Sequence, residues 1–475
     1  MSSQQNYGPK TRPLEHQIEA IDFISRTPEV ALFDEQGLGK TKMIVDAMAK
    51  AMESGDVDGV LVVSPMSLVY VWEAEVLKHS FLTPVVLRGS KTEKRYKFLT
   101  GANFYITNYE AVVSEQGRFE RFCRSRSVAL VLDESARIKN PETRTAQALY
   151  VLAPLASRRI ILTGTPVANK PEDLWGQFFF LDGGRLLGTD FKLFKTRMNE
   201  KSPYYRDELN KLRTEIEANS IRRRKNDALE LPEKVYVNDY VVLEGEQNEL
   251  YRRCADELVV EIRRLDGREL LDQIDNVLKK LLRLTQIASN PLLLDQTFTG
   301  SCAKLDRLSD LVPLILNESE KVVVWTCFID NISLLKSHLG DYFPLVIHGS
   351  VPVEERSRIV SKFQEKDRSR VLIANPAAAR EGLTLTRASA AIYFDRNFSL
   401  MDYLQSQDRI HRIGQDQKCT IYKQIARNTI DEYTDMLIEI KTEIARFLQG
   451  DQPDLVPTVL EDLLNKQTLL RAIGG

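Results

Sequence analysis

The sequence predicts an α/β protein whose β-sheets are parallel and doubly wound. Short, continuous apolar runs alternate along the chain with stretches of helical periodicity. Strands buried on both faces give such runs, and strands that alternate with helices form parallel sheets. The predicted strands are residues 30–33, 59–65, 104–109, 128–132 and 159–162 in the first half, and 321–326, 344–347, 371–374 and 390–394 in the second. Polar motifs follow several of these strands, at the edge where such sheets bind ligands.

The stretch 34–41, Asp-Glu-Gln-Gly-Leu-Gly-Lys-Thr, has the context of a phosphate-binding loop, because it joins a predicted strand to a predicted helix. Gly37 and Gly39 let the backbone curl with its N–H groups pointing inward, and the helix adds the positive end of its dipole. Lys40 is placed to reach the β- and γ-phosphates, and Thr41 to ligate Mg²⁺. The loop therefore predicts ATP and Mg²⁺ as cofactors.

Two residues near this loop carry further information. Asp34 stands where the generic phosphate-binding pattern has its first glycine, which is a departure from that pattern. Gln17 lies upstream, at the start of a segment with helical periodicity. Its amide can both donate to and accept from the edge of an adenine ring, although taken alone it also suits the surface of a helix.

Two polar turns follow strands downstream of the loop. Asp133 and Glu134 end the predicted strand 128–132, and an acidic pair in this place suits ATP hydrolysis. The first carboxylate would hold the Mg²⁺ shell, and the second would orient or deprotonate the attacking water. Thr163 and Thr165 belong to a Thr-Gly-Thr-Pro turn, which is either a strand-end turn stabilised by side-chain hydrogen bonds or a relay between nucleotide and nucleic acid.

Composition bounds the class of protein. The chain has 475 residues, enough for two to three domains, and a formal net charge of −2, which argues neither for nor against nucleic acid. The five cysteines and five histidines are scattered without metal-ligand spacing, so we expect free thiols and no zinc site. No basic-then-apolar leader and no apolar run of membrane-spanning length are present, which predicts a cytoplasmic protein with no membrane partner.

The ordered series of motifs resembles that of Swi/Snf-type DNA-dependent ATPases, a branch of helicase superfamily two. The matching stretches of the first half are 34–41, 63–76, 107–110, 133–140 and 162–181. More telling matches are the Arg-Arg-x-Lys and Leu-Pro-x-Lys signature at 222–234 and the helix at 281–294, because general helicases lack them. The resemblance spans roughly residues 12–445, and the compactness of the chain favours a bacterial or phage member.

The second half carries the rest of the series, with two departures. Gly349 and Ser350, followed by Arg356 and Phe363, match the family, and so does 405–415, Gln-Ser-Gln-Asp-Arg-Ile-His-Arg-Ile-Gly-Gln. The segment 379–385 keeps only one of the three glycines usual in the family and has threonine in place of asparagine. Residues 395–400 keep the aromatic of the Asp-x-x-Trp-Asn-Pro pattern as Phe398, but not its Asn-Pro.

The resemblance implies two tandem RecA-like parallel-sheet lobes with a helical insertion and a C-terminal helical tail. The predicted divisions are 1–230, 231–300 as a helical linker, 301–445 and 446–475. Arg409 and Arg412, three residues apart and expected on one helical face, would act as arginine fingers on the γ-phosphate, with ATP held between the lobes. Gln405, Thr163 and Thr165 would couple the nucleotide to nucleic acid.

The resemblance also implies a nucleic-acid partner, most simply double-stranded DNA bound through phosphates without sequence specificity. The expected contacts are Ser64, Thr107, Lys139, Asn169, Gly349, Ser350 and Thr384. Three functions stay open at this point: a duplex translocase, a strand-separating DNA or RNA helicase with a pin hidden in 185–231, or an ATP-switched subunit of a complex. A protein partner would supply targeting in each case.

Overall fold

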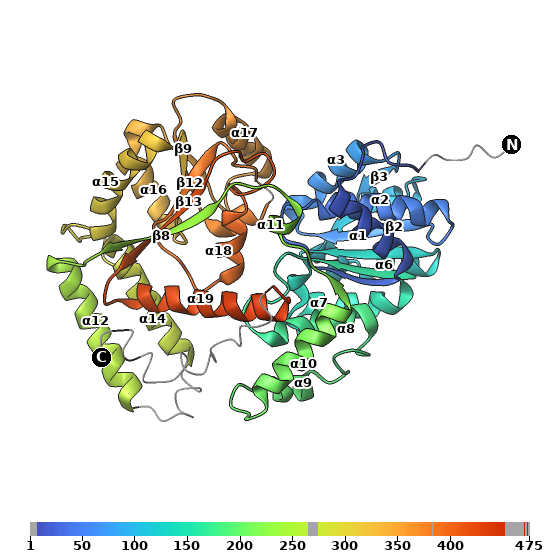
Figure 1. The fold of residues 1–475 in the computed structure, drawn as a ribbon, viewed down its shortest axis with the longest axis horizontal. Coiled ribbons are helices and arrows are strands. Elements are labelled where there is room, and N and C mark those ends of the chain that lie inside the picture. Colours follow the sequence, from blue (N-terminus) through green and yellow to red (C-terminus); the bar gives the residue numbers. More distant parts are fainter. Residues whose placement is uncertain (1–6, 265–273, 382, 452–469, 471–472, 474–475) are drawn as a thin grey trace. The chain divides into compact units, whose positions relative to one another are not determined.

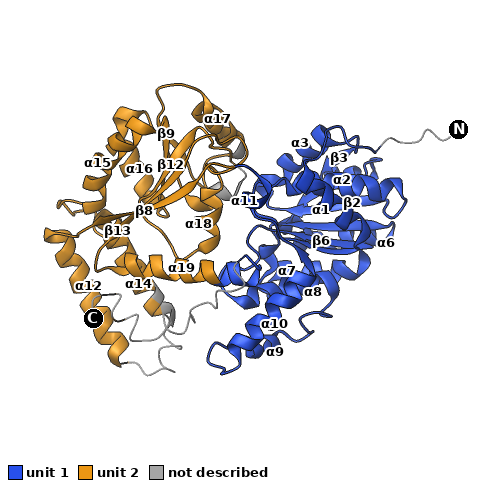
Figure 2. Cartoon of the chain, in the orientation of Figure 1, with its two compact units in different colours: residues 1–230, 444–456 blue, residues 231–443, 457–475 orange. Residues whose placement is uncertain are grey.

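The computed structural model describes residues 7–264, 274–381, 383–451, 470 and 473 (Figure 1). The chain divides into two compact units, which Figure 2 shows in different colours. Unit 1 comprises residues 1–230 and 444–456, and unit 2 comprises residues 231–443 and 457–475. The finer division into four parts stays a prediction, and the tail beyond residue 451 lies almost wholly outside the described residues.

Unit 1 is built on a parallel sheet of seven strands in the order β3-β4-β2-β5-β6-β1-β7. Strands β2 and β4 are fully buried, and so is β5 except for its last residue, as expected for continuous apolar runs when helices cover both faces. All neighbouring strands of this sheet pair in parallel. The strands are β1 (Glu29–Leu32), β2 (Gly59–Ser64), β3 (Pro84–Val86), β4 (Phe104–Asn108), β5 (Val128–Asp133), β6 (Arg158–Leu162) and β7 (Ser220–Ile221).

Many helices of unit 1 connect its strands, and several of them bury an apolar face. Helix α2, which follows the glycine loop, buries ten of its residues, and the eight apolar ones belong to the hydrophobic core of the unit. Side-chain caps begin some of the others, such as Ser90 at α4 and Asp190 at α9. The helices are α1 (Glu15–Arg26), α2 (Lys40–Glu53), α3 (Val69–His79), α4 (Lys91–Leu99), α5 (Tyr109–Ser114), α6 (Gln116–Arg124), α7 (Arg144–Leu152), α8 (Trp175–Asp182), α9 (Phe191–Arg197), α10 (Tyr205–Ala218) and α11 (Lys225–Ala228).

Unit 2 has a second parallel sheet, with six strands in the order β10-β11-β9-β12-β13-β8. Its core gathers apolar residues of β9, β11 and β12 with those of α15 and α16. The strands are β8 (Lys234–Val241), β9 (Lys321–Trp325), β10 (Leu345–Ile347), β11 (Val371–Ala374), β12 (Ala388–Tyr393) and β13 (Cys419–Ala426). The helices are α12 (Gly245–Arg264), α14 (Ile274–Ser289), α15 (Ala303–Glu318), α16 (Ile329–His338), α17 (Val353–Gln364), α18 (Leu400–Gln407) and α19 (Ile430–Leu448), of which the last residues, from 444 on, belong to unit 1.

The α/β class with two parallel-sheet lobes is confirmed, and every strand predicted from an apolar run is present. Four strands were not predicted. β3 and β7 are short edge strands, and β8 lies in the region expected to be a helical linker. β8 alternates exposed and covered residues along the sheet edge, and β13 contains polar residues such as Lys423 that ion pairs satisfy internally. Neither pattern is a continuous apolar run.

The region 185–231, in which a strand-separating pin was considered, holds helices α9, α10 and α11 and the two-residue strand β7. A projecting β-hairpin is therefore absent from these described residues. Among the described residues, no helix is long and apolar enough to cross a membrane. All five cysteines are described and free of disulfide bonds, as predicted.

Candidate nucleotide site of unit 1

Three neighbouring strands bring the polar motifs of unit 1 to one edge of its sheet. β5, β6 and β1 are adjacent and parallel, so the segments that follow them leave the sheet on the same side. These segments are the acidic pair Asp133 and Glu134, the turn 163–166 and the loop 34–39. The predicted gathering of these motifs at the carboxyl edge is thus what the sheet order produces.

The glycines of the loop are required by its backbone. Gly37 has φ 92° and Gly39 has φ 82°, both in the left-handed region that side chains disfavour. A Cβ on Gly39 would also lie 2.4 Å from Nε2 of Gln17. Helix α2 begins at Lys40, directly after this turn, which places the start of a helix at the loop as phosphate binding needs.

The Lys40 ammonium is engaged by the loop itself. Its Nζ donates to the carbonyl oxygens of Asp34, at 2.7 Å, and Glu35, at 3.2 Å. Burial lowers the pKa of Lys40, and the nearby carboxylates of Glu134, Asp34 and Asp133 oppose that change. The lysine is therefore held among acidic groups, at the place where phosphate charge would be bound.

Asp133 is held by two aromatic side chains. The indole Nε1 of Trp72 donates to Asp133 Oδ2 at 2.8 Å, and the Tyr109 hydroxyl donates to the Asp133 carbonyl at 2.6 Å. Burial raises the pKa of Asp133, while the Trp72 hydrogen bond and the Lys40 charge lower it. Sequence reasoning treated Trp72 only as part of a motif match and missed this role. Its spacing from Asp133 offers no local signal, because the contact depends on the order of the strands.

Glu134 is positioned differently from its neighbour. Its backbone has φ 53°, which is unusual for a residue with a side chain and typical of functional turns. The Gln36 amide, from the phosphate-binding loop, donates to Glu134 Oε1 at 3.1 Å. The loop and the predicted catalytic carboxylate are therefore in direct contact.

Arg222 and Arg223, the two arginines of the Arg-Arg-x-Lys signature, donate hydrogen bonds to the start of the phosphate-binding loop and to the residue before it. β7 pairs with β1 and ends at Ile221, so the next residues lie beside the segment that follows β1. Arg223 donates to the buried carboxylate of Asp34, at 3.1 and 2.5 Å, and Arg222 donates to the Phe33 carbonyl at 2.6 Å. Asp34, the departure from the generic pattern, is thus neutralised by an arginine rather than exposed to phosphate.

Gln17 is placed against the loop, as its predicted adenine role requires, but both ends of its amide have backbone partners. Oε1 accepts from the Leu14 N–H at 3.0 Å, and Nε2 donates to the Leu38 carbonyl at 3.1 Å. Gln17 therefore braces the loop in this structure. Its recognition of adenine stays a prediction.

The turn 163–166 is a buried, hydrogen-bonded strand end. Thr163 Oγ1 accepts from the Thr165 N–H at 3.1 Å, and both threonines are covered. Gln177 of α8 donates to the Pro166 carbonyl and accepts from the Ser135 hydroxyl, each at 2.8 Å. Gln177 thereby links this turn to the segment after Glu134, a link the sequence analysis did not predict.

The predicted nucleic-acid contacts divide into buried and accessible groups. Ser64 and Thr107, at the ends of β2 and β4, are 0% and 1% exposed. Lys139 and Asn169 converge on Asp173, whose carboxylate lies 3.7 Å from Lys139 Nζ and accepts from the Asn169 N–H at 2.7 Å. In unit 2, Gly349 and Ser350 are exposed and Thr384 is partly exposed. These contacts stay predictions, and Gly382, within the altered glycine segment, lies outside the described residues.

The two predicted arginine fingers do not share a helical face. Helix α18 ends at Gln407, and Arg409 and Arg412 lie in the turns that follow. The chain there makes tighter backbone bonds, such as Arg409 N to Ser406 O, which end the helix. Arg409 Nε donates to the carbonyl of the buried Gln405 at 3.0 Å, and Arg412 donates to the Leu383 carbonyl at 3.3 Å. The expectation that both arginines lie on one helical face is therefore wrong. Their role on the γ-phosphate does not require a helix and stays a prediction.

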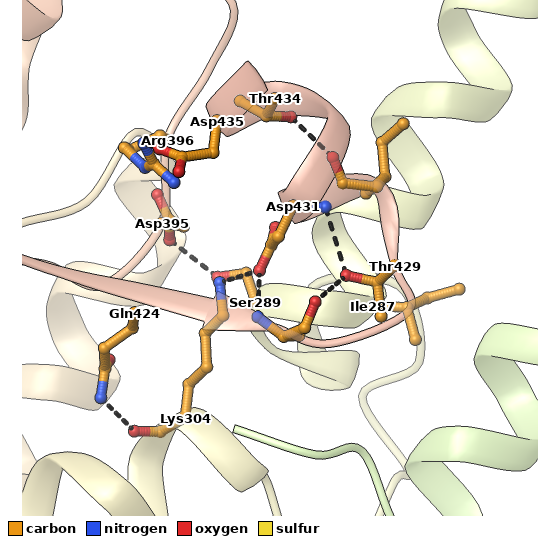
Figure 3. Close-up of polar contacts among 12 residues, drawn as sticks. Ile287, Ser289, Lys304, Asp395, Arg396, Gln424, Thr429, Asp431, Thr434 and Asp435 are labelled. Atoms are coloured by element: carbon orange, nitrogen blue, oxygen red, sulfur yellow. Dashed lines mark hydrogen bonds and ion pairs between the residues drawn. The ribbon is translucent and has the colours of Figure 1, made fainter. Parts of the chain in front are cut away.

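Buried charges also connect elements of the unit 2 scaffold (Figure 3). Lys304, which is 0% exposed, forms a 2.6 Å ion pair with Asp431 at the start of α19, and its carbonyl accepts from Gln424 at 3.3 Å. Ser289 donates to Asp395 at 2.7 Å. Figure 3 shows these residues converging from α14, α15, β13 and α19, so they connect elements that are distant in sequence.

The residues predicted for Mg²⁺ fit such an ion. Thr41 lies in the first turn of α2, and Asp133 presents a buried carboxylate at the end of β5. No group of three or more potential metal-ligating side chains gathers within the described ranges. Mg²⁺ needs none, because it is usually held by one or two protein oxygens together with phosphates and water.

These features define a P-loop protein with two parallel-sheet α/β units. The chain belongs to the SNF2-related domain family, which matches residues 16–293, and the helicase conserved C-terminal domain matches residues 303–414. The "Putative ATP-dependent helicase/translocase YwqA" of Bacillus subtilis is 30% identical over 430 residues, covering 86% of this chain and 45% of that protein. "ISWI chromatin-remodeling complex ATPase ISW1" of Saccharomyces cerevisiae is 25% identical over 426 residues, covering 84% of this chain and 37% of that protein.

Among solved structures, the "Sulfolobus solfataricus SWI2/SNF2 ATPase core in complex with dsDNA" is 26% identical and covers 99% of both chains, with a TM-score of 0.44. The family assignment rests on the family matches and on the sequence relatives. The chain spans less than half the length of the curated relatives it matches.

Proposed function

We propose that the chain is a DNA-stimulated ATPase that moves along duplex DNA without separating its strands. The observation that carries the proposal is the convergence of Lys40, Asp133 and Glu134 at the carboxyl edge of unit 1, with the loop 34–39 braced from three sides. Family membership supports ATP as the nucleotide. The naming of relatives as a helicase/translocase and as a chromatin-remodeling ATPase supports nucleic acid as the partner.

In this mechanism each side chain has a distinct task. The Lys40 ammonium exchanges its hydrogen bonds to the Asp34 and Glu35 carbonyls for contacts with the β- and γ-phosphates. Glu134 accepts the proton of the attacking water. Thr41 and Asp133 would hold Mg²⁺, which when bound neutralises charge on the phosphate oxygens. Arg409 and Arg412 of unit 2 would stabilise the charge that develops on the γ-phosphate.

Nucleic acid would be contacted mainly through its phosphates, by Lys139, Asn169, Gly349, Ser350 and Thr384. Such contacts carry little sequence information and weaken as salt rises. The absence of a hairpin from residues 185–231 supports translocation rather than strand separation. We further propose that a protein partner directs the motor to its target.

The decisive experiment measures the ATPase rate without nucleic acid and with single-stranded DNA, duplex DNA and RNA in parallel. We expect duplex DNA to stimulate most, together with displacement of a triplex strand and no unwinding of a forked duplex. Lys40→Ala should reduce turnover to background, and normal turnover in this variant would refute the assignment of the loop. Unwinding would select a helicase instead, and indifference to every nucleic acid would select an ATP-switched subunit.

A further inference from the structure

Gln36 touches two functional segments of unit 1 at once. Its side-chain amide donates to Glu134 Oε1 at 3.1 Å. On its other side it packs against the turn that follows β6, where a Cβ built on Gly164 would lie 2.9 Å from Gln36 Cγ and 3.1 Å from the Gln36 backbone nitrogen. Gly164 therefore permits a close approach that any larger residue would prevent.

The contact to Glu134 acts on the group that must accept a proton. An N–H donor bound to a carboxylate oxygen is a charge-assisted hydrogen bond and holds that oxygen in one orientation. A general base must instead direct a lone pair at the water it deprotonates. As long as Gln36 holds Oε1, the carboxylate is oriented by the loop rather than by the substrate.

The loop holds the second reactive group in the same way. Lys40 is bonded to the carbonyls of Asp34 and Glu35, the two residues immediately before Gln36. Residues 34–36 thus engage both the lysine that binds phosphate and the carboxylate that accepts the proton. Both groups must exchange a loop partner for the nucleotide or the water before reaction.

The turn 163–166 is connected so that its movement would reach Gln36. Gly164 lies against Gln36. The Gln177 amide forms hydrogen bonds with both the Pro166 carbonyl and the hydroxyl of Ser135, the residue after Glu134. A shift of this turn therefore changes the packing of Gln36 and the anchorage of the Glu134 segment together. Interiors packed this closely transmit such displacements rather than absorb them.

We propose that Gln36 is a positioning residue that latches Glu134 in the resting form and releases it when the turn 163–166 moves. The stimulation of hydrolysis by nucleic acid then passes through the Gln36–Glu134 hydrogen bond. This inference rests on the proposed function, since it concerns how a DNA-stimulated ATPase is kept slow without DNA.

The test is Gln36→Met, which keeps the length of the side chain and removes the N–H donor. ATPase rates are measured without DNA and at saturating duplex DNA, together with the affinity for a fluorescent ATP analogue. The DNA-free rate should rise about tenfold, the factor expected for losing one hydrogen bond to a charged group. The DNA-saturated rate and the nucleotide affinity should stay within about twofold of wild type, so the stimulation ratio falls.

Gln116→Met is the matched control. Gln116 Nε2 donates to Glu120 Oε1 at 3.1 Å in α6, so this variant removes the same type of bond at the same distance away from the site. It should leave the stimulation ratio unchanged. Gln36→Glu provides a second variant of the latch, because it keeps the size of the side chain and replaces the donor with a carboxylate that repels Glu134. It too should raise the DNA-free rate.

The outcomes separate the latch from the proposed function. A wild-type chain that nucleic acid does not stimulate overturns both. Normal wild-type stimulation with an unchanged ratio in Gln36→Met overturns the latch alone. An equal fall of both rates in Gln36→Met and Gln36→Glu also overturns it, because that result assigns Gln36 a purely structural role.

Discussion

Each sheet has a buried carboxylate beside a loop at a strand end, and the two carboxylates differ in their place in the chain and in their partners. Asp34 belongs to the loop after β1, whereas Asp395 follows β12 and contacts the loop after β9. In unit 1, Asp34 is 0% exposed and pairs with the guanidinium of Arg223. In unit 2, Asp395 is 1% exposed and accepts the Cys327 N–H at 2.6 Å, along with the side chains of Ser289, Thr326 and Asn331.

The difference supports the proposal that phosphate binds to the loop after β1 and not to the loop after β9. In unit 2 the carboxylate of Asp395 takes up a loop N–H, so an internal anion occupies the donor that a phosphate would need. Beside it, burial and the Asp395 charge raise the pKa of the Cys327 thiol. In unit 1 the carboxylate is neutralised by an arginine, and the loop keeps its glycines and Lys40. The two units thus differ in what the buried carboxylate binds: a backbone N–H of the loop in unit 2, and an arginine side chain in unit 1.

The largest expected effect concerns what unit 2, in which no phosphate-binding loop is predicted, contributes to ATP hydrolysis. Arg412→Ala should lower turnover by about 10³- to 10⁵-fold, because an arginine acting on the γ-phosphate stabilises charge only in the transition state. ATP affinity should change far less. Arg387→Ala, which removes a surface partner of Glu320, is the control in the same unit. Turnover and affinity both at wild-type level would remove Arg412 from the mechanism.

The next effect concerns Glu134, the carboxylate of unit 1 that we propose as the general base. Glu134→Gln should still bind ATP but hydrolyse it about 10²- to 10⁴-fold more slowly, since the amide cannot accept the proton of water. Filter trapping of radiolabelled ATP and a single-turnover assay measure the two steps. Glu142→Gln, at an exposed position, should behave as wild type. Unimpaired cleavage by Glu134→Gln would transfer the base role to another group.

The carboxylate of unit 2 should matter for stability rather than chemistry. Asp395→Asn should lower the free energy of unfolding of unit 2 by about 3 kcal/mol, because several buried donors lose a charged acceptor. Denaturant unfolding measures the loss, and hydrogen exchange locates it in β9 and β12. Asp341→Asn, on the surface, should change nothing. An Asp395→Asn protein as stable as wild type would show that its neutral donors find other partners.

The smallest effect tests the support of Asp133. Trp72→Phe removes one N–H donor and keeps the aromatic ring, so turnover at low Mg²⁺ should fall about 10- to 100-fold, as for other residues that orient a metal ligand. High Mg²⁺ should restore part of the loss. Trp175→Phe removes a comparable indole hydrogen bond, to the Gly188 carbonyl at 3.1 Å, without reaching Asp133. A Trp72→Phe enzyme with unchanged Mg²⁺ dependence would make Trp72 a packing residue only.

The parts of the site that could be predicted are those that short stretches of neighbouring residues identify. Gly37, Gly39, Lys40 and the acidic pair follow apolar runs, so both their chemistry and their place at a strand end could be read directly. The contacts of Trp72, Gln36, Arg222 and Arg223 could not. Each joins segments that are distant in sequence, such as Gln36 and Glu134, 98 residues apart. The helical spacing of Arg409 and Arg412 was wrong because α18 ends two residues before Arg409.

Local periodicity and turn chemistry therefore determined the class of fold and predicted the phosphate-binding loop, since these depend on neighbouring residues. The family was indicated by the resemblance of the ordered series of motifs. The order of the strands settled the rest. The pairing of β7 with β1 brings Arg222 and Arg223 against the phosphate-binding loop. The placement of β6 beside β1, and of β5 beside β6, brings Gly164 and Glu134 to Gln36. Strand order is a property of long-range packing, and no run of adjacent residues encodes it.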